Sequence, residues 1–171
     1  MLEVLEELNL ELGSLHGPVV SNVLAAVALI ELGGDAQKIA RELTWGEFED
    51  FCADILRASG FKVARNIILK KPRMQIDIIA ESPELVLSID CKHWKKSAGD
   101  AALQRFAANQ ISRTVALRLK MKTDAVPIAS LILTMTEETP RFVGGVAVVP
   151  LFLLRSFLNL FYEVREHLRL I

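Results

Sequence analysis

The spacing of apolar residues predicts a helical segment at the start of the chain. Leucines recur at helical intervals over residues 2–12, and residues 19–32 are apolar almost all round up to a glycine pair at 33–34. A helix that is apolar all round must be buried in its own chain or in a partner. With a short helix over 36–43, residues 1–43 are predicted to be a helical extension for packing or dimerisation. A helix-turn-helix is the weaker alternative, because this region is acidic and offers no basic recognition helix.

From residue 44 onward the pattern predicts an α/β domain, in the order α-β-β-β-α-β-β-α. Thr44 and Glu47 form a capping-box pattern that begins a helix ending before Gly60. Alternating apolar residues then predict strands over 61–69, 75–80 and 85–91, with a basic connection at 70–73 and a hairpin between the last two. Strands over 127–135 and 142–149 and a long final helix from Pro150 complete the order.

A helix is predicted over 100–120, between the third and fourth strands. Its apolar side is expected to consist of Leu103, Phe106, Ala107, Ile111, Val115 and Leu119.

The net charge of −1 hides an uneven distribution of charge along the chain. Residues 1–60 carry 11 acidic and 3 basic side chains, whereas residues 61–122 carry 13 basic and 5 acidic ones. A hydrophobic content of 51% excludes a disordered protein and supports a packed core. A basic middle section favours an anionic partner over an acidic one.

The cysteines and the hydropathy of the chain indicate the cellular compartment in which the protein works. Cys52 and Cys91 make no metal-binding cluster and are expected to be buried thiols in a reducing compartment. The apolar runs over 18–30 and 142–154 are shorter than the roughly 20 residues of a spanning helix. The acidic start of the chain also does not resemble a signal peptide. We therefore expect a cytoplasmic protein with no membrane partner; a membrane-associated protein, the alternative, rests only on the mean hydropathy of +0.33.

Three charged residues lie where the predicted hairpin should be buried. Asp90 and Lys92 share one face of their strand because residues two apart point the same way, and Asp77 lies on the neighbouring strand. Two carboxylates on adjacent strands can hold Mg²⁺, and an ammonium beside them can act on a water, as in phosphodiester hydrolysis. Alternatively, these are solvated residues on an exposed face. However, charges within so apolar a strand are costly unless they are paired or bind an ion.

Four segments follow one another in an order known from a nuclease family. They are Trp45-Gly46-Glu47-Phe48-Glu49 before Gly60-Phe61, Ile76-Asp77-Ile78-Ile79, Ile89-Asp90-Cys91-Lys92 and Leu131-Ile132-Leu133-Thr134. From residue 44 to about 163 the chain resembles the PD-(D/E)xK nuclease superfamily, and within it Mrr-like restriction endonucleases and archaeal Holliday junction resolvases. Ile76 stands where the family has Pro. Asp90 stands where Mrr relatives often have Gln and resolvases have Glu, which leaves the subfamily open.

The resemblance implies a fold and an activity. Residues 44–171 would form a restriction-endonuclease-like domain: an α-β-β-β-α-β core with a central mixed sheet flanked by helices. Asp77, Asp90 and the backbone carbonyl of Cys91 would hold Mg²⁺ or Mn²⁺, and Lys92 would orient the attacking water. The protein would be a metal-dependent endonuclease acting on DNA; whether the DNA is branched, methylated, damaged or single-stranded stays open. A catalytically silent nuclease-fold module for DNA binding or scaffolding is the alternative.

Many relatives take a further acid from the first helix, and two glutamates compete for that role. Glu47 stands where a capping box requires it. Glu49 shares a stripe with Cys52, Ala53 and Leu56, which should face the sheet. We therefore predict Glu49 as the fourth catalytic residue, acting at the metal directly or through a water, and Glu47 as the cap.

Basic residues on both sides of the acids are candidates for DNA contact. They are Lys70, Lys71, Arg73, Lys95 and Lys96, and the alternative is a solvated face. Gln75 lies two residues before Asp77 and is expected to support that residue. The apolar stretch over 19–32 and the leucine-rich end of the chain suggest a homodimer, whose two active sites would suit cuts on two strands.

Overall fold

The structure is a computed structural model that describes residues 43–94, 97–121, 125–135 and 139–171. The helices predicted over 2–12 and 19–32, and all but the last residue of the helix predicted over 36–43, therefore lie outside the described residues.

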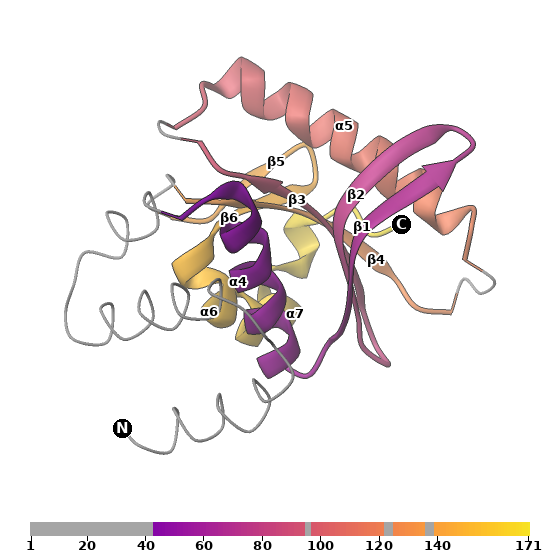
Figure 1. The fold of residues 1–171 in the computed structure, drawn as a ribbon, viewed down its shortest axis with the longest axis horizontal. Coiled ribbons are helices and arrows are strands. Elements are labelled where there is room, and N and C mark those ends of the chain that lie inside the picture. Colours follow the sequence, from indigo (N-terminus) through magenta and orange to yellow (C-terminus); the bar gives the residue numbers. More distant parts are fainter. Residues whose placement is uncertain (1–42, 95–96, 122–124, 136–138) are drawn as a thin grey trace.

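A six-stranded mixed sheet forms the centre of the domain (Figure 1). Its strands are β1 (Lys62–Lys70), β2 (Arg73–Glu81), β3 (Val86–Lys92), β4 (Ile128–Thr134), β5 (Arg141–Val143) and β6 (Val146–Pro150), in the order β1-β2-β3-β4-β6-β5. The strands β1, β2 and β3 pair antiparallel, β3 pairs parallel with β4 and β4 with β6, and β5 runs antiparallel to β6. The predicted mixed sheet is confirmed.

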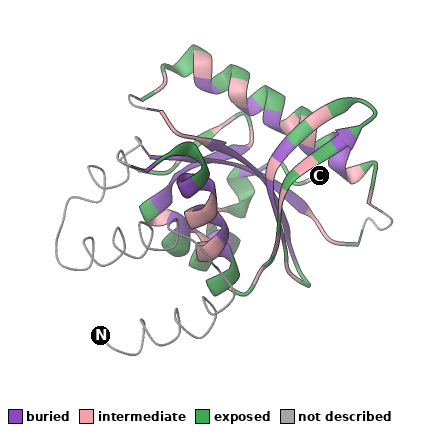
Figure 2. Cartoon of the chain, in the orientation of Figure 1, coloured by how far each residue is buried: buried purple, intermediate pink, exposed green. Residues whose placement is uncertain are grey.

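Helices cover both faces of this sheet. Helix α5 (Asp100–Arg118) lies across one face, and α4 (Trp45–Ala58), α6 (Leu154–Asn159) and α7 (Phe161–Val164) lie on the other (Figure 1). The central strands β3 and β4 are buried over almost their whole length between these layers (Figure 2). The order from α4 to β4 is the predicted α-β-β-β-α-β core, so the restriction-endonuclease-like fold class is confirmed.

Helix α4 begins with the predicted capping box. The Thr44 N–H donates to Glu47 Oε2 at 2.6 Å, and the Glu47 N–H donates to Thr44 Oγ1 at 3.4 Å. Phe48 on the next turn is fully buried against the sheet. Gly60 ends the helix with a positive φ of 88°, which a glycine adopts without steric cost. The capping role predicted for Glu47 is confirmed.

The first hairpin is longer than predicted. Lys70 pairs with Arg73, so the turn consists of Lys71 and Pro72 alone. The basic connection predicted over 70–73 is wrong at both ends, because alternation of exposed and partly buried residues continues along both strands to the turn.

The buried side of α5 differs from the predicted stripe. Val115 and Leu119 are 37% and 78% exposed, so placing them on the apolar side was wrong. Positions four apart rotate by about 40° per step around a helix of 3.6 residues per turn, so an unbroken i+4 stripe leaves the face it began on. The buried side instead follows the true period through Leu103, Ala107, Gln110, Thr114 and Leu117.

The end of the chain is also divided differently. Gly144 and Gly145 have φ values of 58° and 82° and form the turn between β5 and β6, so the single strand predicted over 142–149 is wrong. Pro150 is the last residue of β6 and begins no long helix. Short 3₁₀ segments, Leu151–Leu153 and Arg165–His167, flank α6 and α7 instead.

The last residue is tied to the sheet by backbone hydrogen bonds in both directions between Ile171 and Ile128. Within the ranges that the structure describes, no helix combines the length and apolar character needed to cross a membrane.

Candidate active site

Asp77 lies where the regular pairing of β2 is interrupted on both sides. The pairing with β1 skips Asn66 opposite Asp77, and Asn66 has a left-handed φ of 53°, which asparagine tolerates. The pairing with β3 ends at Ile78 and Ile89. The Asp77 side chain replaces the missing strand partner, because its Oδ2 accepts a hydrogen bond from the Cys91 N–H at 2.8 Å. The gap in the sheet therefore aims this carboxylate at β3.

Asp90 and Lys92 both lie on the face of the sheet covered by α5. Asp90 is 3% exposed, and its Oδ2 lies 2.7 Å from Lys92 Nζ. Its Oδ1 lies 2.9 Å from Nη1 of Arg113 on α5. Lys92 also lies 5.5 Å from the ring centre of Phe106 on the same helix. The alternation predicted for β3 is confirmed, since Ile89 and Cys91 pack in the opposite layer with α4.

Glu49 approaches the site from α4. It is 6% exposed, and its carboxylate accepts hydrogen bonds from the Trp45 indole and, at 3.3 Å, from Nη2 of Arg65 on β1. Arg65 also pairs with Asp50. Glu49 therefore points to the sheet as predicted, and two donors hold it there.

The negative charges of the three acids act on one another. Burial raises the pKa of Asp77 above its usual value, the hydrogen bond from Cys91 opposes this, and the charges of Asp90 and Glu49 raise it further. The charge of Lys92 lowers it. A cation bound between these carboxylates would relieve their repulsion.

Cys52 on α4 and Cys91 on β3 are fully buried free thiols, as predicted. Their side chains interact, and this contact together with burial raises the pKa of Cys91 well above its usual value. Cys91 is thus a neutral thiol that packs α4 against β3. Its backbone N–H is held by Asp77, so the side chain and the backbone fix this point of β3 from opposite sides.

The residues present fit a hard divalent cation. Asp90 Oδ2 is buried and lies 2.7 Å from Lys92 Nζ, and no other described residue donates a hydrogen bond to it. With Asp77 and the Cys91 carbonyl it would supply the oxygen donors that Mg²⁺ and Mn²⁺ prefer. The described residues contain no cluster of three or more His, Cys, Asp and Glu side chains able to hold a metal, so a site here depends on backbone oxygen and water as well.

Three of the five predicted DNA-contacting residues lie at one end of the first hairpin. Lys70, Lys71 and Arg73 are all exposed there, whereas Lys95 and Lys96 lie outside the described residues. Gln75 is exposed and donates from Nε2 to Asn66 Oδ1 at 3.3 Å. It therefore contacts the strand interruption beside Asp77 and not the carboxylate.

Sequence reasoning missed Arg113, Gln110 and Arg65. Gln110 is fully buried and donates to the Ser88 carbonyl at 2.7 Å and to its hydroxyl at 3.1 Å. Arg113 follows one turn later on the same side of α5 and also donates to Gln110 at 3.3 Å. The available signal was their spacing, because residues three apart lie on one side of a helix. No local pattern marks Arg65, because its partners lie 15 and 16 residues away.

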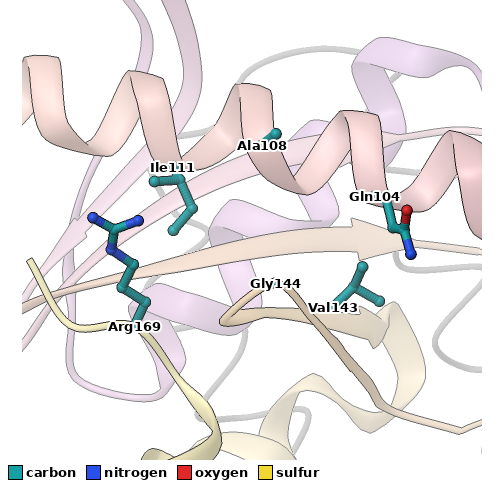
Figure 3. A pocket seen from close by; sticks show the side chains of 6 residues that line it. All are labelled: Gln104, Ala108, Ile111, Val143, Gly144 and Arg169. Carbon is teal, nitrogen blue, oxygen red and sulfur yellow. The ribbon is translucent and has the colours of Figure 1, made fainter.

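A hollow flanks α5 on each side. The larger, about 350 Å³, is lined by Gln104, Ala108, Ile111, Val143, Gly144 and Arg169, and it lies toward β5 and the chain end (Figure 3). The smaller, about 300 Å³, lies toward β2 and includes Arg113. None of Glu49, Asp77 and Asp90, which we call the acid cluster, lines the larger hollow. Its larger volume therefore does not make it the candidate active site.

The chain is similar to a family model, to a relative and to a solved structure. Residues 40–117 match a family model, Mrr_cat, described as restriction endonuclease. An uncharacterized protein of Archaeoglobus fulgidus is 28% identical over 128 residues, which are 72% of this chain and 97% of that protein. A crystal structure of a protein of unknown function, AF1548, aligns with a TM-score of 0.38 and 19% identity over 51% of this chain. The alignment spans 46% of that protein's length.

The matched range contains every acid of the site and Lys92. It begins just before α4 and ends within α5, so it covers the elements that position Glu49, Asp77 and Asp90. Over residues 40–117 the chain is therefore similar to the restriction endonucleases that the Mrr_cat model describes.

Proposed function

We propose that this protein is a metal-dependent endonuclease that hydrolyses phosphodiester bonds of DNA. The observation that carries the proposal is the meeting of Asp77, Asp90 and Lys92 at the gap between β2 and β3, with the charge of Glu49 acting on the same point. Mg²⁺ or Mn²⁺, when bound, would neutralise charge on the phosphate. Asp77, Asp90 and the Cys91 carbonyl would hold the ion, with Glu49 at its edge directly or through a water.

Lys92 is the residue proposed to act on the water and on the developing charge at phosphorus. Its ammonium is partly buried, with its side chain 16% exposed, and the carboxylate of Asp90 and the ring of Phe106 fix its position. A positioned cation in such a site stabilises negative charge more strongly than one in water, because solvent screens it less. Gln75 supports the interruption in β1 and β2 that aims Asp77.

The proposed function also includes a domain organisation, a cellular compartment and a set of DNA contacts. The nuclease domain would occupy residues 44–171, with residues 1–43 as a helical extension that serves packing or a homodimer. The protein would work in the cytoplasm, without a membrane partner. Its DNA would meet Lys70, Lys71 and Arg73 at the hairpin end, and Lys95 and Lys96 after β3.

One observation favours a second function, a catalytically silent module that binds DNA. Both oxygens of Asp90 lie within ion-pair distance of a cation, Lys92 or Arg113, so the carboxylate is already neutralised without a metal. In that case the pairs stabilise the fold and the site binds no ion. The two functions differ in whether a divalent cation binds.

The deciding experiment combines metal binding with cleavage. Calorimetry with Mg²⁺ and Mn²⁺ and cleavage of linear, nicked, flapped and four-way DNA are measured for wild type, Lys92→Ala and Asp77→Asn. In an endonuclease Lys92→Ala keeps metal and DNA binding but loses about 10²–10⁴-fold in cleavage rate. Asp77→Asn loses metal binding and cleavage together. A wild type that neither binds divalent ions nor cuts any of these DNAs would overturn the enzyme and favour the silent module.

A further inference from the structure

The smaller hollow beside α5 has the chemistry of an anion site. It is lined by Arg73, Met74, Gln75, Asn109, Ser112 and Arg113. Two of these side chains are guanidinium groups and three are neutral hydrogen-bonding groups, and none is acidic. This composition matches the side chains with which proteins contact phosphate groups of nucleic acids.

Arg113 lines the hollow and also contacts Asp90 of the acid cluster. Its two hydrogen bonds to described residues, to Asp90 and Gln110, are both donated by Nη1. A guanidinium carries five N–H donors, so those on Nη2 and Nε are left for a ligand. The side chain is 28% exposed, so these donors can be reached from solvent. The Arg113 guanidinium would then lie between the bound phosphate and the Asp90 carboxylate.

The other residues that line the hollow also supply hydrogen-bond donors. Arg73 is exposed at the start of β2 and makes no ion pair with a described residue. Asn109 and Ser112 lie on consecutive turns of α5 and are both exposed. Guanidinium groups match a phosphate in a two-point geometry that fixes its orientation.

We propose that this hollow binds a phosphate of the DNA strand next to the one at the acids, with Arg73 and Arg113 as its charged contacts. The inference rests on the proposed function and deepens it, because it assigns a path to the substrate strand: from the hairpin end, between β2 and α5, to Asp90. Arg113 has two partners in this arrangement, and it keeps the strand phosphate and the Asp90 carboxylate apart. The larger hollow offers only one cation, Arg169, against mainly apolar side chains and is not part of this path.

The test places a negative charge in the hollow without touching the acids. Ser112→Asp introduces a carboxylate at an exposed position of α5, and Ser156→Asp on α6, on the opposite face of the sheet, is the matched control. Binding of labelled single-stranded and duplex oligonucleotides to the full chain is measured in EDTA over a range of salt. Ser112→Asp is expected to weaken binding at least tenfold, and Ser156→Asp to leave it unchanged.

A second variant keeps the test valid if Ser112→Asp fails to fold. Arg73→Gln lies at an exposed hairpin end and should flatten the slope of log K against log salt by about 1. Wild-type affinity and slope in both Ser112→Asp and Arg73→Gln, or no DNA binding by the wild type, would overturn the phosphate site.

The two proposals can fail separately. If the wild type cuts DNA with Mg²⁺ while the hollow variants bind normally, the phosphate site is refuted and the endonuclease stands. If the hollow variants lose binding while the wild type shows no metal-dependent cleavage, the phosphate site is supported and the endonuclease is refuted.

Discussion

Variants of the two glutamates at the start of α4 should change different properties. Glu47→Ala should lower stability, and Glu49→Gln should weaken metal binding. Removing the Glu47 side chain in Glu47→Ala deletes the 2.6 Å bond from the Thr44 N–H, which is worth about 1 kcal/mol net at a partly exposed helix end. The loss of a carboxylate from the first turn adds about 0.3–1 kcal/mol through the helix dipole. The reciprocal bond at 3.4 Å is donated by the backbone N–H of residue 47, so the variant keeps it. The total of about 1–2 kcal/mol lowers Tm by about 3–6 °C in a chain of 171 residues.

Glu49→Gln should behave in the opposite way. The isosteric amide still offers an oxygen to Trp45, Arg65 keeps its pair with Asp50, and the repulsion on Asp77 is relieved. These changes offset one another, so stability should change by less than about 1 kcal/mol. The affinity for Mg²⁺ or Mn²⁺ should fall about 10–100-fold, as when a supporting metal partner is lost.

Calorimetry measures both quantities, the melting transition and the binding of metal ions. Glu81→Gln, at the exposed end of β2, is the matched control and should change neither. The reasoning would be refuted if Glu47→Ala lost metal binding at an unchanged Tm while Glu49→Gln lost stability and bound metal normally. Such a result would exchange the roles of the two residues.

Three further predictions test the electrostatics and the fold. Burial and neighbouring carboxylates raise the pKa of Asp77 in the folded protein above its ordinary value of 3.8. The free energy of unfolding therefore falls as pH rises from 3.8 through the raised pKa, and Asp77 costs no stability below 3.8. Asp77→Asn should therefore raise Tm near pH 7 but not near pH 3, and an equal Tm change at both would contradict this. Replacing Lys70 and Lys71 together by Gln should flatten the log K against log salt slope for DNA by about 2 units; an unchanged slope would move the DNA elsewhere. Leu119→Ala, at a side chain 78% exposed, should cost less than about 0.5 kcal/mol in denaturant unfolding, whereas Leu117→Ala, at 7%, should cost about 2–4 kcal/mol; equal losses would contradict the observed face of α5.

The sequence by itself determined the features that depend on near neighbours. The capping box of α4 requires only Thr44 and Glu47 at the right spacing. The facing of Asp90 and Lys92 requires only that β3 is a strand, since alternate residues of a strand share a face. The order of motifs and the α-β-β-β-α-β core followed from such local patterns, and the family match over residues 40–117 agrees with them.

Other features were decided only when distant segments packed together. The face that α5 buries depends on which strands it crosses, because Gln110 and Thr114 can be buried only where Ser88 and Ser130 offer hydrogen bonds. Arg113 becomes a partner of Asp90 for the same reason, across 23 residues of chain.

The direction of the Asp77 side chain is the clearest feature of this kind. It arises from a kink at Asn66 on one neighbouring strand and the end of pairing on the other, and no periodicity within β2 contains either. Local chemistry specifies which residues can form an element. The direction in which a buried charge points is specified by the partners that the other layers bring to it, because a charge removed from water must be paired wherever it lies.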